Sequence, residues 1–359
     1  MERVYLRPTA FVDSPVGLDT AAQRLAGGLI WFSAVEVIRR SGADASREMV
    51  PVSEIEARLS GLDEAAATAW QRLIAPRPSL TLRERTIRLD QPQVMGIVNV
   101  TPDSFSDPGQ LAETTSAIDA GHAMTAAGAA IVDVGGESTR PGAQPVWEGD
   151  ETERVTPVVR ALAAAGTAVS VDTRKAVVMA VALEAGAAMV NDVSALTFDN
   201  RSVEVLREKS CPVVLMHHQR SPETMQQNPT YDGPVLLEVY DWLEARVEAA
   251  VAAGIDRARI IVDPGIGFGK TVQHNLELMN GLALFHGLGC PLLLGASRKR
   301  TIGALSNEAP PDQRLGGSLT LALKAAEQGA QIIRVHDVAE TVQALRVWRG
   351  LRDAALAAR

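Results

Sequence analysis

The chain has 359 residues, a net charge of −8 and a hydrophobic fraction of 46%, but only 4% of its residues are aromatic. This composition is typical of helices packed on parallel strands. No long run of Lys and Arg occurs, so a nucleic-acid partner is disfavoured. No run of about 18 apolar residues occurs either, so no membrane span is expected.

The chain contains two cysteines, Cys211 and Cys290, and each stands directly before a proline and an apolar run. Both are predicted to lie at the buried starts of inner strands. Two cysteines are too few for a disulfide framework. The N-terminal residues show no apolar core of a signal peptide. We therefore expect a cytoplasmic protein.

Residues 1–80 are predicted to form an N-terminal extension of unknown role, a small α/β or helical segment. A helix is expected over about 53–73, with Ser53 as its N-cap and Glu56 completing a capping box. The alternating residues 80–89 predict a hairpin that leads into the core. Residues 81–359 are predicted to form the catalytic domain.

Eight strand-like apolar runs alternate with helical stretches from Val94 onward. The predicted strands are 94–100, 130–135, 168–172, 189–193, 212–217, 260–263, 291–296 and 331–335. The predicted helices are about 112–127, 150–165, 174–186, 201–209, 234–253, 272–285, 314–329 and 338–349. Continuous apolar runs indicate parallel strands buried on both faces. Eight such units favour a closed (β/α)₈ TIM barrel, and a doubly wound open sheet is the alternative.

Polar side chains follow most of these strands, at the end where barrels carry their sites. They include Asn99, Asp107, Arg140, Asp172, Asn191, His217, Asp263, Lys299, Arg334 and His336. Each has an ordinary alternative: Asp172, for example, could simply cap the next helix. Their shared position at strand ends favours a site for a polar ligand.

These residues fall into two chemical groups. Asp172, Asn191 and Asp263 suit a flat heterocycle that presents several N–H donors, with Phe268 against its ring. A second group suits a phosphate or pyrophosphate with a divalent cation. Its members are Asn99, Asp107, Arg140, Arg334 and His336.

One motif is misleading. Gly269-Lys270-Thr271 matches the end of a Walker A loop, but Pro264 stands where that loop requires its first glycine. A proline there would offer no backbone N–H to a phosphate, so a P-loop ATPase is disfavoured.

Seven motifs, in order, make residues 80–359 resemble the dihydropteroate synthases. They are G-I-V-N-V-T-P-D-S-F-S-D (96–107), G-G-E-S-T-R-P-G (135–142), V-D-T (171–173), N-D-V-S (191–194), D-P-G-I-G-F-G-K (263–270), S-R-K (297–299) and R-V-H-D (334–337). The resemblance implies a (β/α)₈ barrel that joins 4-aminobenzoate to (7,8-dihydropterin-6-yl)methyl diphosphate. The products would be 7,8-dihydropteroate and diphosphate, and the family is the target of sulfonamides. A homodimer is expected, with small molecules as the substrates.

The resemblance also implies roles for individual residues. The pterin contacts would be Asp172, Asn191, Met216, Asp263, Phe268, Lys299 and Arg334. The diphosphate contacts would be Asn99, Arg140, Arg334 and His336. The aminobenzoate would lie near Phe105, Thr139, Pro141 and Ser297. Mg²⁺ would be bound by Asn99 and Asp107, and the catalytic residues would be Asp263, Lys299, Arg334 and His336.

The expected chemistry needs no nucleophilic side chain. The bond from the pterin methylene to the diphosphate oxygen would break first, with positive charge delocalised into the pterin. Mg²⁺, Arg and His side chains would stabilise the departing diphosphate. The free arylamine would then attack. Loss of diphosphate would therefore be dissociative.

Three positions depart from the family pattern: Pro108 in the first loop, Arg220 after the fifth strand, and Thr301 after Ser-Arg-Lys-Arg. Pro108 is expected to stiffen its loop, and Thr301 to alter the aminobenzoate rim. Two alternative functions are a pterin-binding methyltransferase domain and an inactive paralogue that acts as a scaffold through residues 1–80. The intact polar set favours the synthase over both.

Overall fold

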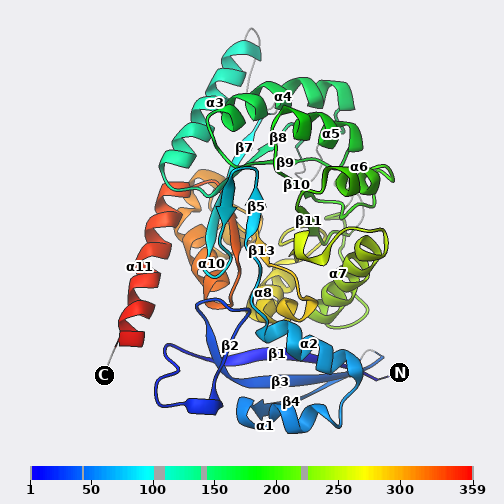
Figure 1. The fold of residues 1–359 in the computed structure, drawn as a ribbon, viewed down its shortest axis with the longest axis vertical. Helices are drawn as coiled ribbons and strands as arrows, with labels where there is room; N and C mark the ends of the chain where they lie inside the picture. Colours follow the sequence, from blue (N-terminus) through cyan, green and yellow to red (C-terminus); the bar gives the residue numbers. More distant parts are fainter. Residues whose placement is uncertain (1, 43, 101–109, 139–143, 220–224, 358–359) are drawn as a thin grey trace.

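A closed parallel barrel forms most of the molecule (Figure 1). The computed structural model describes residues 2–42, 44–100, 110–138, 144–219 and 225–357. Its eight-stranded sheet has the order β12-β11-β10-β9-β8-β7-β14-β13. A parallel bridge pairs Val262 with Leu292, and the Val262 amide donates to the Pro291 carbonyl at 2.9 Å. The two ends of the sheet therefore meet. The predicted (β/α)₈ barrel is confirmed, and the open-sheet alternative is wrong.

Most barrel strands coincide closely with the predicted apolar runs, but β13 is shorter than the run predicted over 291–296. They are β7 (Gln93–Asn99), β8 (Ile131–Gly135), β9 (Val169–Asp172), β10 (Met189–Asp192), β11 (Val213–Met216), β12 (Ile260–Asp263), β13 (Leu293–Leu294) and β14 (Ile332–Val335). The helices are α3 (Gln110–Ala126), α4 (Glu148–Ala164), α5 (Ala176–Ala185), α6 (Ser202–Lys209), α7 (Val235–Ala252), α8 (Val272–Gly281), α9 (Arg300–Leu305), α10 (Leu315–Glu327) and α11 (Val338–Ala357). Short 3₁₀ turns are η3 (Arg257–Arg259), η4 (Leu282–Leu288) and η5 (Pro311–Gln313). Among the described helices, none is long and apolar enough to cross a membrane.

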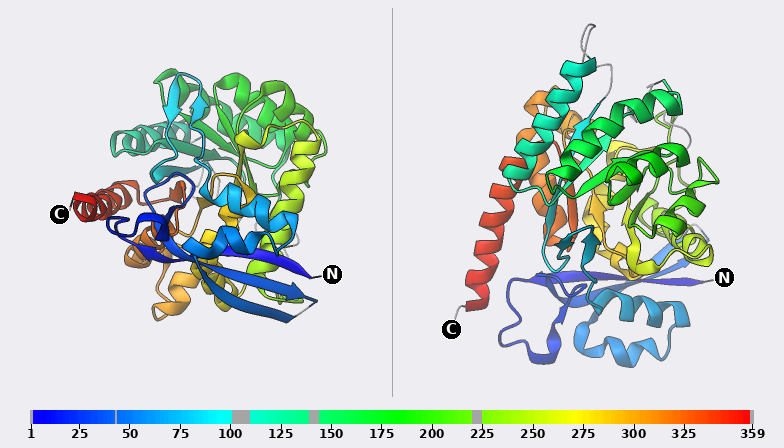
Figure 2. Two further views of the ribbon diagram at one scale, coloured as in Figure 1. Left: turned by 60° about the horizontal axis from the view of Figure 1, so that its bottom comes forward. Right: turned by 45° about the horizontal axis from the view of Figure 1, so that its top comes forward.

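The chain before the barrel forms an antiparallel sheet at one end of the molecule (Figures 1 and 2). Its strands are β1 (Arg3–Val12), β2 (Gln23–Arg24), β3 (Trp31–Ser41) and β4 (Asp44–Pro51). The 3₁₀ turn η1 (Asp19–Ala21) lies between β1 and β2. Both β1 and β4 pair with β3. Helices α1 (Val52–Leu59) and α2 (Glu64–Ile74) follow the sheet. The extension is therefore α/β, while the boundary between residues 80 and 81 stays a prediction.

The single helix predicted over 53–73 is wrong in two respects. The segment is divided into α1 and α2, because the Asp63 side chain accepts a hydrogen bond from the Ala66 amide and starts a new helix. Helix α1 has Pro51, not Ser53, at its N-cap, without a side-chain cap. Pro51 ends β4 directly before the helix, so α1 starts one residue before Ser53.

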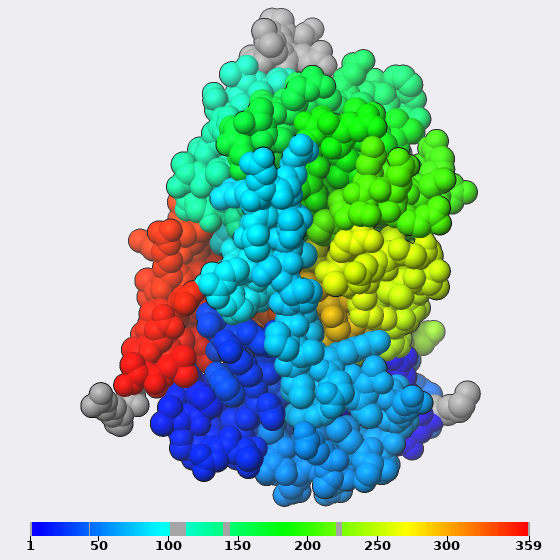
Figure 3. Space-filling view, viewed as in Figure 1, coloured from blue at the N-terminus to red at the C-terminus, as the bar shows by residue number. Residues whose placement is uncertain are grey.

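A short hairpin plugs the amino-terminal end of the barrel. Strands β5 (Leu80–Leu82) and β6 (Arg85–Ile87) pair as predicted. Figure 3 shows the segment that contains them running from the N-terminal sheet over this face of the barrel. The hairpin shares one apolar cluster with a residue at the start of every barrel strand. These residues are Met95, Ile131, Ala168, Met189, Val214, Ile261, Leu293 and Ile332. With this end filled, a ligand must enter at the carboxyl ends of the strands.

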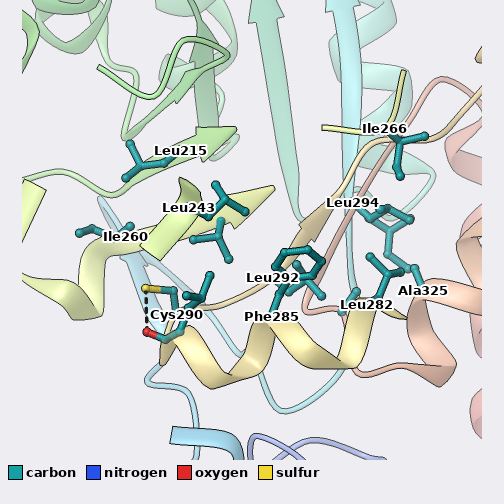
Figure 4. Packing of buried hydrophobic residues seen from close by; sticks show 14 of the residues in the cluster. Leu215, Leu243, Ile260, Ile266, Leu282, Phe285, Cys290, Leu292, Leu294 and Ala325 are labelled. Carbon is teal, nitrogen blue, oxygen red and sulfur yellow. Dashed lines mark hydrogen bonds between the residues drawn. The ribbon is translucent and has the colours of Figure 1, made fainter. Parts of the chain in front are cut away.

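The segment before β13 is also tightly packed. The helix predicted over 272–285 is divided into α8 and η4, and Phe285 of η4 belongs to the same buried cluster as Leu292 (Figure 4). Cys290 lies in this cluster, with its Sγ 3.8 Å from the Leu288 carbonyl oxygen. Cys211 is buried two residues before β11. The predicted burial of both cysteines is confirmed.

A buried ionic network joins the loops after β8 and β9. The Lys175 Nζ lies 3.1 Å from Glu137 Oε1, donates to the Val146 carbonyl at 2.7 Å, and pairs with Glu151 at 2.5 Å. Arg174 also binds Glu137, with a distance of 3.0 Å between Nε and Oε2. Glu137 accepts from the Val146 amide at 3.0 Å. The Lys175 ammonium therefore contacts two buried carboxylates, shares Glu137 with Arg174, and links the two sides of the loop between β8 and α4.

We expect Lys175→Met to destabilise the protein strongly. The substitution leaves the buried carboxylates of Glu137 and Glu151 with less compensating charge, which costs about 3–5 kcal/mol. Lys209→Met is the matched control, because Lys209 pairs at 3.3 Å with an exposed Glu184, and exposed pairs contribute about 0–1 kcal/mol. Urea unfolding followed by circular dichroism measures both. Equal midpoints for the two variants would show that the network adds no stability.

Candidate active site

Arg334 lies at the centre of the carboxyl end of the barrel. Its Nε donates to Asp133 Oδ2 at 2.6 Å, and its Nη2 donates to Asp172 Oδ2 at 2.7 Å. Asn191 donates from Nδ2 to the same Asp133 oxygen at 2.9 Å. Four strands, β8, β9, β10 and β14, thus contribute to one hydrogen-bonded cluster. The structure brings together the predicted residues Asp172, Asn191 and Arg334.

Asp133 is a site residue that the sequence prediction did not assign. It is fully buried in the middle of β8. A signal was present, because side chains alternate along a strand and Ile131, two residues earlier, lies in the barrel interior. Asp133 therefore also points inward. A carboxylate in the middle of an apolar strand requires a partner, and here the partners are Arg334 and Asn191.

Two carboxylate oxygens in this cluster have no hydrogen-bond partner within the described chain. They are Asp133 Oδ1 and Asp172 Oδ1, and both are inaccessible to solvent. Burial raises the pKa of Asp172 to about 7, although the nearby Arg334 guanidinium lowers it. Buried acceptors without donors cost free energy. The site is therefore suited to a ligand that supplies N–H donors.

A second group lies around the loop after β12. Asp263 Oδ1 accepts from the Gly265 amide at 2.7 Å. Lys299 donates to the Ile266 carbonyl, and its Nζ lies 4.5 Å from the centre of the Phe268 ring. Burial raises the pKa of Asp263, opposed most by Lys299. Burial lowers the pKa of Lys299 to about 8, opposed by Asp263. The predicted residues Asp263, Phe268 and Lys299 therefore lie together.

Gly265 shows how closely this loop approaches its neighbour. Its φ is +67°, and a Cβ there would lie 1.9 Å from the His217 carbonyl oxygen. No other residue type fits at such a distance. The loop after β12 is consequently held against the end of β11, which also carries the buried Met216.

Lys270 and His217 form a buried pair that the sequence prediction did not recognise. Lys270 Nζ lies 2.8 Å from His217 Nδ1 and 2.9 Å from the Phe268 carbonyl oxygen. Burial lowers the pKa of both groups well below their usual values. Lys270 thus points into the protein, and Thr271 caps α8 by accepting from the His274 amide. The rejection of a P-loop is consistent with these contacts.

The remaining described site residues lie at the rim. His336 Nδ1 is 3.1 Å from Ser297 Oγ, and the His336 amide donates to the same oxygen at 3.2 Å. Thr301 is buried and accepts from Asn275 Nδ2 at 2.9 Å. Asn275 in turn accepts from the Gly267 amide at 2.8 Å. Thr301 therefore supports the loop after β12.

Asn99 ends β7 with its side chain exposed. Several predicted positions lie outside the described residues: Phe105, Asp107, Pro108, Thr139, Arg140, Pro141 and Arg220. Within the described ranges, no group of three or more His, Cys, Asp or Glu side chains could hold a metal ion.

Comparison with known proteins agrees with this geometry. Residues 95–336 match the family described as pterin binding enzyme. Escherichia coli (strain K12) dihydropteroate synthase is 47% identical over 263 residues, which cover 73% of this chain and 92% of the relative.

Two solved structures give the same result. Yersinia pestis dihydropteroate synthase, crystallised as a sulfonamide drug complex, has a TM-score of 0.72 and 46% identity, covering 77% of this chain and 99% of its own. Xanthomonas albilineans dihydropteroate synthase in complex with 7,8-dihydropteroate has a TM-score of 0.70 and 43% identity, covering 77% and 99%. Because the family match spans more than half of the chain and the E. coli relative is covered almost in full, this chain belongs to the dihydropteroate synthases, transferases of the pterin-binding enzyme family.

Proposed function

We propose that the protein condenses (7,8-dihydropterin-6-yl)methyl diphosphate with 4-aminobenzoate, giving 7,8-dihydropteroate and diphosphate. The observation that carries this proposal is the cluster of Arg334, Asp133, Asp172 and Asn191, with two buried carboxylate oxygens that have no donor among the described residues. The complex of the X. albilineans relative with 7,8-dihydropteroate supports the same chemistry.

The pterin would lie between this cluster and the loop after β12. Its N–H groups would donate to Asp133, Asp172 and Asp263, and Asn191 would complete the edge contacts. Lys299 would donate to a ring acceptor. Met216 and Phe268 would cover the faces of the ring, together with the flat guanidinium of Arg334. The Phe268 ring suits contact with a ring face, because the Lys299 ammonium packs against only one of its sides in a cation–π contact.

The diphosphate would be bound at the rim by Asn99, Arg140, Arg334 and His336. Arg334 directs one N–H of Nε and one of Nη2 at carboxylates. A guanidinium has five N–H donors, so others remain for phosphate oxygens. His336 is oriented by its two contacts with Ser297. The aminobenzoate would bind close to Ser297, with Phe105, Thr139 and Pro141.

An Mg²⁺ ion is proposed beside the diphosphate, and of its two expected ligands only Asn99 lies among the described residues. Asn99 is exposed at the end of β7, and Mg²⁺ usually takes one or two protein oxygens together with substrate phosphates and water. Asn99 and Asp107 would hold the ion. When bound, it would neutralise negative charge on the departing diphosphate.

We infer a dissociative reaction in which the protein supplies electrostatic stabilisation. The methylene C–O bond breaks, and its electron pair leaves with the diphosphate, which Arg334 and His336 hold. Asp263 stabilises the positive charge that develops on the pterin. The 4-aminobenzoate nitrogen then forms the new C–N bond and releases a proton. An arylamine is uncharged at neutral pH, so no strong base is required.

Purified protein given the pterin diphosphate, 4-aminobenzoate and Mg²⁺ is expected to release one diphosphate for each dihydropteroate formed. A coupled phosphate assay and chromatography of the pteroate measure the two products. Lys299→Ala serves as the inactive control, because it removes the buried ammonium beside Asp263 and Phe268. Release no greater than that of Lys299→Ala would refute the proposed function.

We expect Asp263→Asn to lower kcat on the order of 10²-fold, since the amide keeps the volume but loses the charge that stabilises the pterin cation. Asp192→Asn is the matched control. Asp192 is also buried and accepts from a backbone amide two residues on, at 2.7 Å from Ser194 N. Steady-state kinetics measure kcat for both variants. Equal kcat values would show that Asp263 has no role in the reaction.

Pterin binding is expected to weaken as the pH rises through about 8. Burial lowers the pKa of Lys299 to about 8, so its ammonium is present below that pH and is lost above it. Binding of a dihydropterin, followed by fluorescence from pH 6.5 to 9.5, should fall roughly tenfold per pH unit on the alkaline side. Lys299→Arg keeps its charge over this range. An alkaline decrease that persists in Lys299→Arg would assign it to another group.

A further inference from the structure

The N-terminal sheet is joined to α7 by a row of charged contacts. Three acids lie three residues apart on α7, and therefore on one side of the helix: Glu238, Asp241 and Glu244. Arg3 Nη1 lies 2.9 Å from Asp241 Oδ1, and the Tyr5 hydroxyl donates to Asp241 at 2.9 Å. The sheet is thus fixed to the barrel rather than tethered by the linker alone.

Arg40, near the end of β3, reaches the first turn of α7. Its Nη2 lies 3.3 Å from Glu238 Oε1, and its Nη1 lies 3.4 Å from Asp241 Oδ2. Its Nε donates to the Gly42 carbonyl at 2.9 Å, which fixes the guanidinium. A Cβ on Gly233 would lie 2.8 Å from Nη2. Arg40 therefore rests directly on the backbone where the loop from β11 enters α7.

The same loop contacts the pterin side of the barrel through Tyr231. The Tyr231 hydroxyl donates to the Gly269 carbonyl at 3.0 Å. Its ring packs edge-on against His274, with 4.9 Å between the ring centres. Only one residue separates Tyr231 from Gly233, which Arg40 covers. The short segment 231–233 thus connects the N-terminal sheet to the loop after β12.

From Gly269 the contacts continue to the predicted pterin residues. Lys270, the next residue, donates to the Phe268 carbonyl, and its Nζ lies 2.8 Å from His217 Nδ1. The Phe268 ring lies against the Lys299 ammonium. A Cβ on Gly269 would lie 2.5 Å from Gln219 Cβ, so the loops after β11 and β12 cannot shift independently. The contacts from Arg40 to Phe268 are continuous.

We propose that the N-terminal sheet braces the pterin site, and that Arg40 is a positioning residue for it. By holding Gly233 and Glu238, Arg40 would fix Tyr231, and Tyr231 would fix the loop that carries Phe268 and Lys270. This role rests on the proposed function of the barrel, which it extends to residues 1–80. The ion pairs of Arg40 are partly exposed, with 19% of the Arg40 side chain and 31% of the Asp241 side chain accessible. Their loss is expected to loosen the loop locally.

The test compares Arg40→Ala with Arg39→Ala in the full chain. Arg39 is the neighbouring arginine of β3, and its ion pair is with Glu2, the residue directly before β1, at 3.5 Å. In Arg40→Ala the KM for the pterin diphosphate is expected to rise about 3- to 10-fold, with little change in kcat or in the KM for 4-aminobenzoate. Arg39→Ala is expected to leave all three values unchanged.

Hydrogen exchange measures how firmly the loops are held, and it does not require the enzyme to turn over substrate. In Arg40→Ala, the backbone amides of residues 225–233 and 265–270 are expected to exchange faster than in Arg39→Ala. Tyr231→Phe removes the bond to Gly269 from the barrel side and should accelerate exchange in residues 265–270. If the two substitutions act through one path, their combined effect on KM will be smaller than the product of the separate effects.

Two results would overturn the brace. One is equal exchange in residues 225–233 and 265–270 for both arginine variants. The other is faster exchange throughout the barrel in Arg40→Ala, which would indicate a general loss of stability. An inactive wild-type protein would refute the proposed function, whereas the exchange comparison would still decide whether Arg40 holds the loop.

Discussion

The ion triad of Arg334 with Asp133 and Asp172 is the constraint on which the site depends. Moving three charges out of water is costly, and the mutual attraction of such groups often only balances that cost. The triad persists because β8, β9 and β14 fix its members, with Nε and Nη2 each aligned on one carboxylate. Within the part of the chain that the structure describes, two carboxylate oxygens are nevertheless left without donors. The hydrogen-bonding capacity of the triad is thus not fully used by the described residues. Unused acceptors of this kind are better explained by a binding site than by a role in stabilising the core.

Much of the barrel could be predicted from the sequence, since a parallel strand covered on both faces must be apolar throughout. The hairpin at residues 80–89 was also recognisable, because its alternating side chains have one buried face. The division of α1 from α2 was not predicted. It depends on the Asp63 side chain capping a new helix, and the apolar spacing continues across the break. The split of α8 from η4 similarly reflects packing of Phe285 beneath β13, which local sequence does not encode.

The predicted site residues lie at or after the ends of strands, and the residues that were missed are those whose role depends on a partner elsewhere in the chain. Asp133 lies within a strand, and its partner Arg334 is 201 residues away. Lys270 stands in a motif that suggests a different ligand, and its role appears only when His217 Nδ1 is placed 2.8 Å from its Nζ. The network of Glu137, Lys175 and Glu151 likewise needs two loops to be adjacent. Pairings of this kind are tertiary, so composition and periodicity do not reveal them.

The charge balance of the site favours a ligand rich in N–H groups. Among the described residues, Asp133, Asp172 and Asp263 face two cations, Arg334 and Lys299. Burial raises the pKa of Asp172 to about 7, so near neutral pH a proton partly offsets the excess of negative charge. A ring N–H aimed at Asp172 would supply a donor in place of that proton and would allow the carboxylate to ionise. A pterin offers such donors along one edge, whereas an anionic ligand in the same place would add to the excess. The carboxylates would therefore lie beside the ring that becomes cationic in the proposed reaction. The anionic diphosphate would stay at the rim with Arg334 and His336.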